Sequence, residues 1–386
     1  MIKIKNKKNC SGCHACENIC PKNCITMTSD NEGFLYPVAD KDKCVNCGLC
    51  DKVCPILNKR ISQNTPEAYA CINKNDAVRE VSSSGGIFSL LAENVIKADG
   101  VVFGAVYNDD FLVSHKSAIT MDEVTAMYGS KYVQSKIGNT YFEAKRYLED
   151  GKQVLFSGTP CQIGGLKSYL NKDYPNLICV DIICHGVPSP KVWETYIKWQ
   201  QNRYNSKINS VSMRSKKQGW NTFSMNILFD NDKEYIKDLR SDSYMQVFLK
   251  DVALRPSCYR CNFKGISRNS DITLADYWGV EKQLKNFSDD KGTSLVWINT
   301  EKGKRLFESI ISKIYAEKVG AEKSIQSNPN AVRSARCRVK RKQLFKKLHK
   351  ESFDVLADKY TKEAEIKKKA RVIYHKLKSF PKKLKQ

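Results

Sequence analysis

Two runs of four cysteines near the start of the chain constrain its fold more than any other feature. Both runs follow the pattern C-x2-C-x2-C-x3-C-P, and their cysteines are Cys10, Cys13, Cys16 and Cys20 in the first run and Cys44, Cys47, Cys50 and Cys54 in the second. Three cysteines at this spacing can wrap one loop around three corners of an iron–sulfur cube. The fourth cysteine of each run then points away from that cube.

This spacing is typical of bacterial two-cluster ferredoxins, in which the fourth cysteine of each run ligates the cluster of the other run. The predicted ligand sets are therefore Cys10, Cys13, Cys16 and Cys54 for one 4Fe-4S cluster, and Cys44, Cys47, Cys50 and Cys20 for the other. Structural zinc sites with four cysteines usually come as two separated C-x2-C pairs, so iron–sulfur is favoured over zinc. A protein with these clusters moves electrons.

Length and composition limit the compartment and the number of domains. With 386 residues the chain has room for about two or three domains, so more than a ferredoxin is present. No apolar stretch follows Met1, so we expect no signal peptide, and no run of about 18 apolar residues predicts a membrane span. Thiolate ligands and this start together predict a reducing, cytoplasmic environment for the 16 cysteines.

Positive charge is concentrated at the C-terminal end. Residues 333–386 contain 20 Lys and Arg against 5 Asp and Glu, a large share of the formal net charge of +24. Such a tail can contact an anionic membrane surface, or it can be a solvated, partly helical extension. Because it lacks interleaved aromatic residues and any DNA-binding motif, we do not predict nucleic-acid binding.

The apolar pattern predicts three regions. Residues 1–62 form a ferredoxin-like domain with one strand at 34–38, residues 63–320 form a mixed α/β domain, and residues 321–386 form the basic, partly helical tail. Alternation of strands and helices in the second region predicts at least partly parallel strands. The expected strands are 68–72, 101–106, 154–156, 177–183, 208–213, 222–229, 234–236 and 295–298, and the expected helices are 87–97, 140–149, 162–170, 190–203 and 301–311.

Two small-residue loops in the α/β region are candidate ligand sites. Ser83, Ser84, Gly85 and Gly86 precede the predicted helix 87–97, where free N–H groups favour an anion such as a flavin pyrophosphate. The same residues also read as an ordinary helix N-cap. Gly158-Thr159-Pro160 follows a predicted strand and opens a helix, at the edge of the sheet where ligands bind in α/β folds.

Four further cysteines fall in predicted loops and form a candidate third metal site: Cys161, Cys184, Cys258 and Cys261. The C-x2-C pair at the end of this set needs two more ligands, and the two strand-end cysteines can supply them. From spacing alone, a third cluster, a redox disulfide and a zinc site all remain open. The other four cysteines lack such neighbours and are interpreted as structural or incidental: Cys24, Cys71, Cys179 and Cys337.

Five motifs in a fixed order resemble the coenzyme F-420 hydrogenase/dehydrogenase beta-subunit family, in the form fused to a two-cluster ferredoxin. The resemblance covers roughly residues 1–320 and depends on residues 83–86 (SSGG), 129–135 (GSKYVQS), 158–162 (GTPCQ), 184–190 (CHGVPSP), and 258–261 (CYRC) with 270–279 (SDITLADYWG). Proteins of this family are FAD-containing iron–sulfur oxidoreductases. The resemblance implies that Cys161, Cys184, Cys258 and Cys261 hold a third 4Fe-4S cluster near the flavin.

For the flavin itself, the resemblance implies contacts from Ser83 to Gly86, from Ser130, Lys131 and Tyr132, and from Gly158, Thr159 and Pro160. The form with this fusion is similar to proteins encoded among bacterial surface-polysaccharide genes, which suits a cytoplasmic enzyme acting near a membrane. No motif here reads the deazaflavin coenzyme, so the substrate is not predicted.

The sequence thus predicts an iron–sulfur flavoprotein oxidoreductase that exchanges electrons with a redox partner protein or a small-molecule substrate. His185, next to Cys184, is a candidate proton donor, or else a hydrogen-bond partner outside the ligand shell. One alternative is an electron-transfer beta subunit with no substrate of its own. Another is a zinc-stabilised interaction or nucleic-acid module that uses the basic tail.

Overall fold

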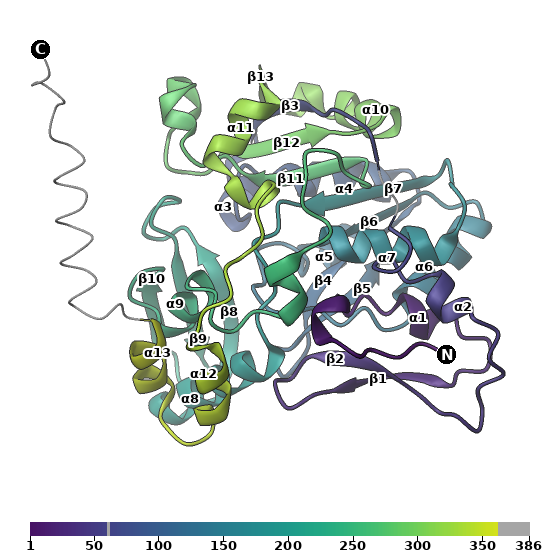
Figure 1. Ribbon diagram of the computed structural model, residues 1–386. Helices are drawn as coiled ribbons and strands as arrows, with labels where there is room; N and C mark the ends of the chain where they lie inside the picture. The colour runs from purple at the N-terminus through teal and green to yellow at the C-terminus, as the bar shows by residue number, and fades with distance from the viewer. Residues whose placement is uncertain (60–61, 362–386) are drawn as a thin grey trace, which may run out of the picture.

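The computed structural model describes residues 1–59 and 62–361, which form a cysteine-rich N-terminal region, a large sheet with helices, and a smaller layer of strands and helices (Figure 1). In the N-terminal region each cysteine run contains a short helix, and a hairpin lies between the runs. The strand predicted at 34–38 is present, and its partner was not predicted, although Ile25 and Met27 are buried between exposed threonines. The elements are η1 (Lys7–Asn9), α1 (Ala15–Asn18), β1 (Ile25–Ser29), β2 (Leu35–Ala39) and α2 (Leu49–Lys52).

An eight-stranded mixed sheet forms the centre of the molecule, in the order β13-β3-β12-β11-β7-β6-β4-β5. The four strands β4, β6, β7 and β11 are mutually parallel, as the strand–helix alternation predicts, and the strands on either side of them run antiparallel to their neighbours. The strands are β3 (Glu67–Asn73), β4 (Val101–Tyr107), β5 (Val113–Ala118), β6 (Val154–Gly158), β7 (Leu177–Ile182), β11 (Ile272–Asp276), β12 (Ser294–Ile298) and β13 (Ile314–Val319).

Helices cover both faces of this sheet because its strands are apolar on both sides. One face packs against α3 (Asp76–Val81), α4 (Ile87–Lys97), α5 (Met121–Thr125) and α10 (Glu301–Ser309). The other face packs against α6 (Thr140–Glu149), α7 (Pro160–Leu170) and α11 (Ala321–Ser327). The helix α1 of the N-terminal region packs against α6 and α7, so the first cysteine run lies over this second face.

A second, three-stranded antiparallel sheet packs with four helices around its own apolar core. Its elements are α8 (Pro190–Tyr204), β8 (Ile208–Ser215), β9 (Ser224–Phe229), β10 (Glu234–Asp238), α9 (Ser243–Leu249), α12 (Arg341–Lys347) and α13 (Phe353–Thr361). The predicted ribbon at 208–236 is therefore present. Short 3-10 turns complete the chain: η2 (Pro256–Arg260), η3 (Val280–Lys282), η4 (Lys285–Phe287), η5 (Ile311–Lys313) and η6 (Pro329–Ala331).

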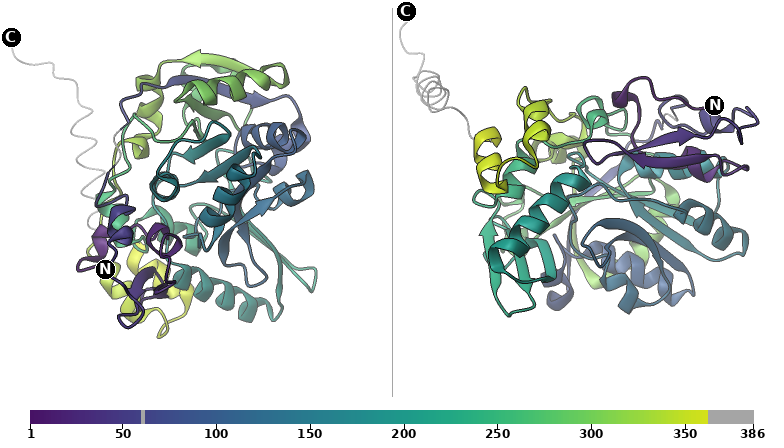
Figure 2. Two further views of the ribbon diagram at one scale, coloured as in Figure 1. Left: turned by 90° about the vertical axis from the view of Figure 1, so that its right-hand side faces the viewer. Right: turned by 90° about the horizontal axis from the view of Figure 1, so that it is seen from below.

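Residues 329–361 differ from the predicted solvated extension. Leu344, Phe353 and Leu356 are buried in the core around α8 and α9, because α12 and α13 place their apolar residues on one side and their lysines on the other. Both views in Figure 2 show these yellow helices on the same side of the molecule as the purple N-terminal region. The remaining part of the predicted tail, residues 362–386, lies outside the described residues.

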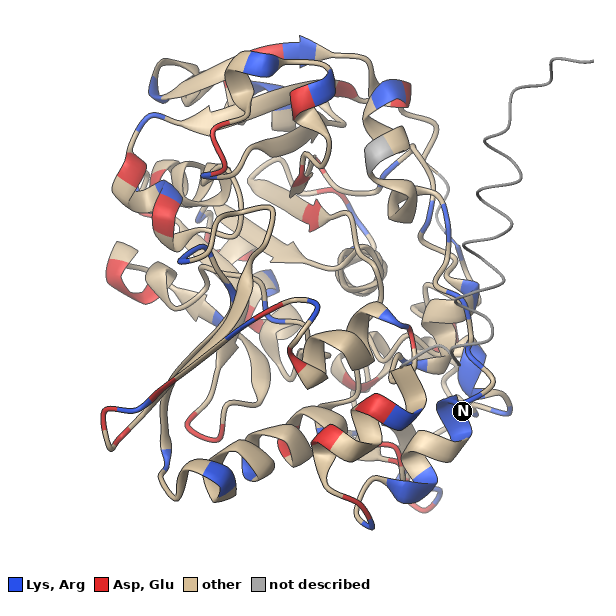
Figure 3. Cartoon of the chain, turned by 90° about the vertical axis from the view of Figure 1, so that its left-hand side faces the viewer, with Lys and Arg blue, Asp and Glu red and all other residues tan. Residues whose placement is uncertain are grey.

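Charges of both signs are interspersed along the helices and loops of the face seen in Figure 3. Within residues 1–59 and 62–361, no helix combines the length and the apolar character that a membrane span requires.

Candidate iron–sulfur and flavin sites

The two cysteine runs exchange their fourth cysteines, as the spacing predicts. One cavity is lined by Cys10, Cys13, Cys16 and Cys54, and a second cavity is lined by Cys20, Cys44, Cys47 and Cys50. The exchange follows from the fold: β1 and β2 pair antiparallel and bring the end of each run beside the start of the other. Each cavity thus presents four thiols from two loops, which is the donor set of a 4Fe-4S cluster.

Backbone and thiol contacts support the second of these cavities. The N–H group of Ile2 donates to the Cys50 sulfur at 3.3 Å, and the Cys20 and Cys24 sulfurs are also 3.3 Å apart. Cys24 therefore lines the same cavity as a fifth thiol, although the spacing predicted no role for it. The other cysteines interpreted as structural line none of these three cavities: Cys71 and Cys179 are buried in the large sheet, and Cys337 is exposed.

A third cavity brings together the four remaining candidate cysteines, Cys161, Cys184, Cys258 and Cys261. They come from three separate segments: the first turn of α7, the loop after β7, and η2 with the residue that follows it. Both strand ends point the same way because β6 and β7 are parallel, and the loops after them meet at one edge of the sheet. The C-x2-C pair reaches this edge from the opposite side.

Local hydrogen bonds hold each segment in place. Thr159 caps α7 through reciprocal bonds with Gln162, which fixes the turn that carries Cys161. The backbone N–H of Val187 donates to the Cys258 sulfur at 3.4 Å, and the Lys264 ammonium donates to the Cys184 carbonyl. The four thiols are therefore anchored independently of one another.

The geometry of all three sites fits a cluster of several irons. Within the described parts of the chain, no three His, Cys, Asp or Glu side chains converge closely enough to hold a single metal ion. The cysteines surround cavities instead, which a four-iron cube fills and a lone zinc ion does not. Burial raises the pKa of the Cys13 and Cys258 thiols to about 12, so a bound cation is needed to make them thiolates.

The first and third cavities are neighbours. Ser11 and Ile56 line both of them, and Lys8 also reaches the third cavity from the N-terminal region. The third cavity is lined as well by Arg268, which is almost completely buried. Its Nε and Nη1 atoms have no hydrogen-bond partner, although the Asp181 carboxylate lies 3.8 Å from Nη1. A cation with unused N–H groups fits a site for a negatively charged cluster.

Two of the three predicted flavin segments lie together. The hydroxyl oxygens of Ser83 and Ser130 are 2.8 Å apart, although 47 residues separate them. The guanidinium of Arg214 donates to the Ser83 carbonyl at 3.1 Å and to the Tyr132 hydroxyl at 3.3 Å, and it forms an ion pair with Asp276. Paired hydroxyls in front of a buried arginine fit a phosphate-bearing group such as FAD.

The glycines of the first segment have a different role from the one predicted. A Cβ on Gly85 would lie 2.4 Å from the Cys71 carbonyl oxygen, so this glycine lets the turn pack against β3. Gly86, in the left-handed region, is the N-cap of α4 and makes no side-chain cap bond. The N-cap interpretation of the serines is therefore wrong, because none of them caps this helix.

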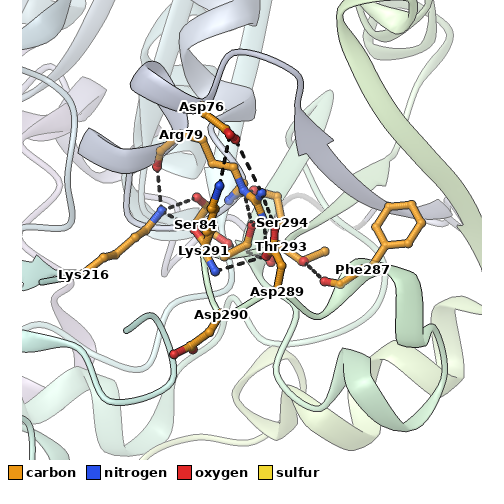
Figure 4. A network of polar contacts seen from close by, with 12 residues as sticks. Asp76, Arg79, Ser84, Lys216, Phe287, Asp289, Asp290, Lys291, Thr293 and Ser294 are labelled. Atoms are coloured by element: carbon orange, nitrogen blue, oxygen red, sulfur yellow. Dashed lines mark hydrogen bonds and ion pairs between the residues drawn. The ribbon is translucent and has the colours of Figure 1, made fainter. Parts of the chain in front are cut away.

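A polar network fixes the same turn from below (Figure 4). The ammonium of Lys216 donates to the carbonyl oxygens of Arg79, Ser84 and Lys291 at 2.6, 2.8 and 2.7 Å, and burial lowers its pKa to about 8. Arg79 forms two bonds to the Asp289 carboxylate, at 2.6 and 2.5 Å. These bonds hold the turn rigidly against the loop that precedes β12.

The other predicted flavin residues lie elsewhere. Lys131 donates to the Tyr128 and Gly129 carbonyls of its own loop, and burial lowers its pKa to about 7. Pro160 lines the third cysteine cavity, and Gly158 and Thr159 directly precede it. The GTP loop is therefore part of the cysteine site rather than of the serine pair.

Two aromatic contacts connect the serine pair with the third cysteine cavity. The Tyr132 ring stacks on Phe248 with centroids 4.5 Å apart, and the edge of Phe248 meets the His185 ring at 5.0 Å. His185 lies beside Cys184 and engages both ring nitrogens: Asn330 donates to Nδ1 at 3.0 Å and Nε2 donates to Asp251 at 2.6 Å. These bonds favour a positioning role over that of a proton donor.

Sequence reasoning missed the cations of the site: Arg214, Lys216, Arg255 and Arg268. Single arginines and lysines in a lysine-rich chain give no periodic signal. Only their burial distinguishes them from surface charges.

Comparison with known proteins identifies both parts of the chain. Residues 9–57 match the family model described as a 4Fe-4S dicluster domain. Residues 151–324 match the model that describes the C-terminal part of the beta subunit of coenzyme F420 hydrogenase/dehydrogenase. A search of the curated proteins gives no match.

Among solved structures, the chain is similar to one from the xenon-derivatised F420-reducing [NiFe] hydrogenase complex of Methanosarcina barkeri. The identity is 16%, the TM-score is 0.46, and the match covers 70% of this chain and 93% of that one.

Proposed function

We propose that this protein is an iron–sulfur flavoprotein oxidoreductase, because residues 151–324 belong to the coenzyme F420 hydrogenase/dehydrogenase beta-subunit family and residues 9–57 are a 4Fe-4S dicluster domain. Its cofactors would be three 4Fe-4S clusters and FAD. The clusters supply one-electron transfer, and the flavin joins it to two-electron chemistry on a substrate.

One observation carries the proposal. Four cysteines from three distant segments line a single cavity, and that cavity shares Ser11 and Ile56 with the site of the first cysteine run. Burial of all four candidate thiols at one place is not needed for folding, because buried cysteines elsewhere in the chain pack singly. A third cluster explains why they converge.

The residues of the chain have distinct roles in this proposal. Ser83, Ser130 and Arg214 bind the phosphate-bearing part of FAD, and Lys216 holds their turn. His185, fixed by Asp251 and Asn330, orients the loop that carries Cys184. The rings of Tyr132 and Phe248 exclude water between the two sites. The domain limits at 62 and 320 remain a prediction, and we expect α12 and α13 to belong to the larger domain.

The test is chemical analysis of protein purified without oxygen. We expect about twelve irons, an equal amount of sulfide and about one FAD per chain. About eight irons without flavin would reject both the third cluster and the flavoenzyme.

A point substitution tests the third site directly. Cys258→Ser should remove about four irons and leave the other two clusters intact, whereas Cys179→Ser, which changes a buried cysteine of β7 that lines none of the three cavities, should keep all of them. Equal iron content in the two variants would contradict a cluster at this cavity.

A second candidate is an electron-transfer subunit that has no substrate of its own. The exposed Cys47 at the rim of the second cavity favours it, because that site is open to a partner protein. The flavin analysis separates the candidates, since bound FAD supports the enzyme. A link to surface polysaccharides and membrane contact through residues 362–386 stay predictions from the sequence.

A further inference from the structure

Arg255 is a completely buried arginine of the large domain whose side chain reaches into the first cysteine loop. Its Nε donates to the Cys10 carbonyl at 2.8 Å, and its Nη2 donates to the Cys10 sulfur at 3.5 Å. The other N–H groups bind the Leu35 carbonyl at 2.9 Å and the Gln134 side chain at 3.0 Å. One guanidinium therefore contacts the backbone and the sulfur of a predicted cluster ligand.

No carboxylate in residues 1–59 or 62–361 lies within ion-pair distance of this guanidinium. Other buried arginines do have acidic partners: Arg79 has Asp289, Arg214 has Asp276, and Arg341 has Glu32. A buried charge without a partner is costly, and the Tyr36 ring 4.3 Å away offsets only part of that cost. The negative charge of four thiolates around iron is the counter-charge that this position lacks.

The cysteine loop is shaped around the guanidinium. A Cβ on Gly12 would lie 2.8 Å from the Arg255 Nη1 atom, and Gly12 has a φ of +69°. Gln134 donates to the Ser11 carbonyl at 3.1 Å and accepts from Arg255, so it holds the loop and the arginine together.

The backbone of Arg255 supports the third cysteine site. Its carbonyl accepts from the N–H of Cys258 at 2.9 Å, and its N–H donates to the Val187 carbonyl at 2.9 Å. Val187 in turn donates to the Cys258 sulfur. A single residue thus contacts a ligand of the first cavity through its side chain and a ligand of the third cavity through its main chain.

We propose that Arg255 is a positioning residue that raises the reduction potential of the cluster held by Cys10, Cys13, Cys16 and Cys54, and that fixes this site against the third one. The inference rests on the proposed function. Reduction adds one electron and therefore one negative charge to the cluster. A fixed positive charge and an N–H···S bond stabilise that reduced state more than the oxidised state, so they raise the potential.

The experiment is a redox titration of the complete protein with its clusters, followed by electron paramagnetic resonance. Arg255→Met removes the charge and the N–H groups but keeps most of the volume. We expect the midpoint potential of one cluster to fall by at least 59 mV, which corresponds to a tenfold change in the one-electron equilibrium, while the other potentials change little.

Arg341→Met is the matched control. Arg341 is also a buried arginine that joins the large domain to the N-terminal region, through two bonds to Glu32, but it contacts no cysteine in the described residues. This variant should be less stable and should keep all cluster potentials. An equal shift in both variants would show a general effect of domain docking and overturn the proposal.

If Arg255→Met does not assemble its clusters, Arg255→Gln serves instead, because the amide keeps a donor without the charge. Unchanged potentials in an assembled Met or Gln variant, or loss of clusters from both, would assign Arg255 a structural role only. Failure of the proposed function is a separate result, since the wild-type protein would then lack the iron of the clusters.

Discussion

The two cysteine loops of the N-terminal region have the same backbone in different surroundings. In each loop, the second and the fourth residue after the first cysteine are in the left-handed region: Gly12 and His14 in one loop, Asn46 and Gly48 in the other. Each loop then enters a four-residue helix, α1 or α2. The cysteine spacing therefore dictates the local fold even though the residues at these positions differ.

The surroundings of the loops separate them. In the first loop Cys13 is buried, and a Cβ on Gly165 of α7 would lie 2.8 Å from its Cβ atom. In the second loop Cys47 is exposed and Val45 is 58% exposed. A Cβ on Gly48 would meet no atom within 4 Å. Equal motifs thus make one site that is enclosed by the large domain and one that faces solvent.

Removing one ligand from each loop should produce the largest difference. Cys13→Ser and Cys47→Ser should each remove about four irons, because each cysteine serves one cluster. Cys13→Ser should in addition lower the free energy of unfolding by about 1–3 kcal/mol more, since its hydroxyl is buried without a partner. Iron analysis and denaturant unfolding measure both effects. Equal stability losses would contradict the enclosed environment of the first loop.

Adding one methyl group to each loop should give a smaller difference. Gly12→Ala and Gly48→Ala both strain a left-handed residue, by about 1–2 kcal/mol. Gly12→Ala also forces the methyl group against the Arg255 guanidinium, which should add about 1–3 kcal/mol. Urea unfolding of the two variants measures the gap, and Gly48→Ala is the control for the strain alone. A gap near zero would mean that Arg255 moves away freely.

The smallest expected effect is a dependence on pH. Burial alone would raise the pKa of Glu17, but hydrogen bonds from His14 and from the Met27 N–H outweigh it and lower that pKa. The resulting stability is complete above the usual glutamate pKa and is lost as the pH falls through the lower pKa of the folded protein.

Glu17→Gln should remove this dependence and cost about 1 kcal/mol near neutral pH. Asp51→Asn, at the equivalent position of the second loop, should behave like the wild type, because the Asp51 carboxylate is 45% exposed and lies 3.7 Å from the N-terminal amine. Thermal unfolding between neutral pH and the region below the glutamate pKa compares the three proteins. Parallel curves for all three would remove Glu17 from the account of the first loop.

Much of the fold could be predicted, because several elements carry their own periodic pattern. The helices Ile87–Lys97 and Thr140–Glu149 were predicted to the residue, and the ribbon of β8, β9 and β10 was predicted in order. The strand β5 was missed, because His115 and Lys116 interrupt its apolar pattern. The strand order of the large sheet depends on pairings between distant segments, such as β3 with β12 and β13, which no local pattern encodes.

The candidate site divides in the same way. Spacing and strand ends predicted which cysteines share a cavity, because a thiol set is defined by residue type. The serine pair was predicted from a resemblance alone, and the buried arginines were not predicted at all. Their role depends on which charges the fold leaves unpaired, and that is a property of the three-dimensional arrangement.

The bond between Glu32 and Arg341 has a consequence for the order of events during synthesis. The two partners are 309 residues apart, and α12 and α13 follow the end of the family match at residue 324. The first domain to leave the ribosome therefore waits for nearly the whole chain before its docking surface is complete. Its cysteine loops stay open to iron-delivery machinery during that interval, and the last helices close the molecule over them.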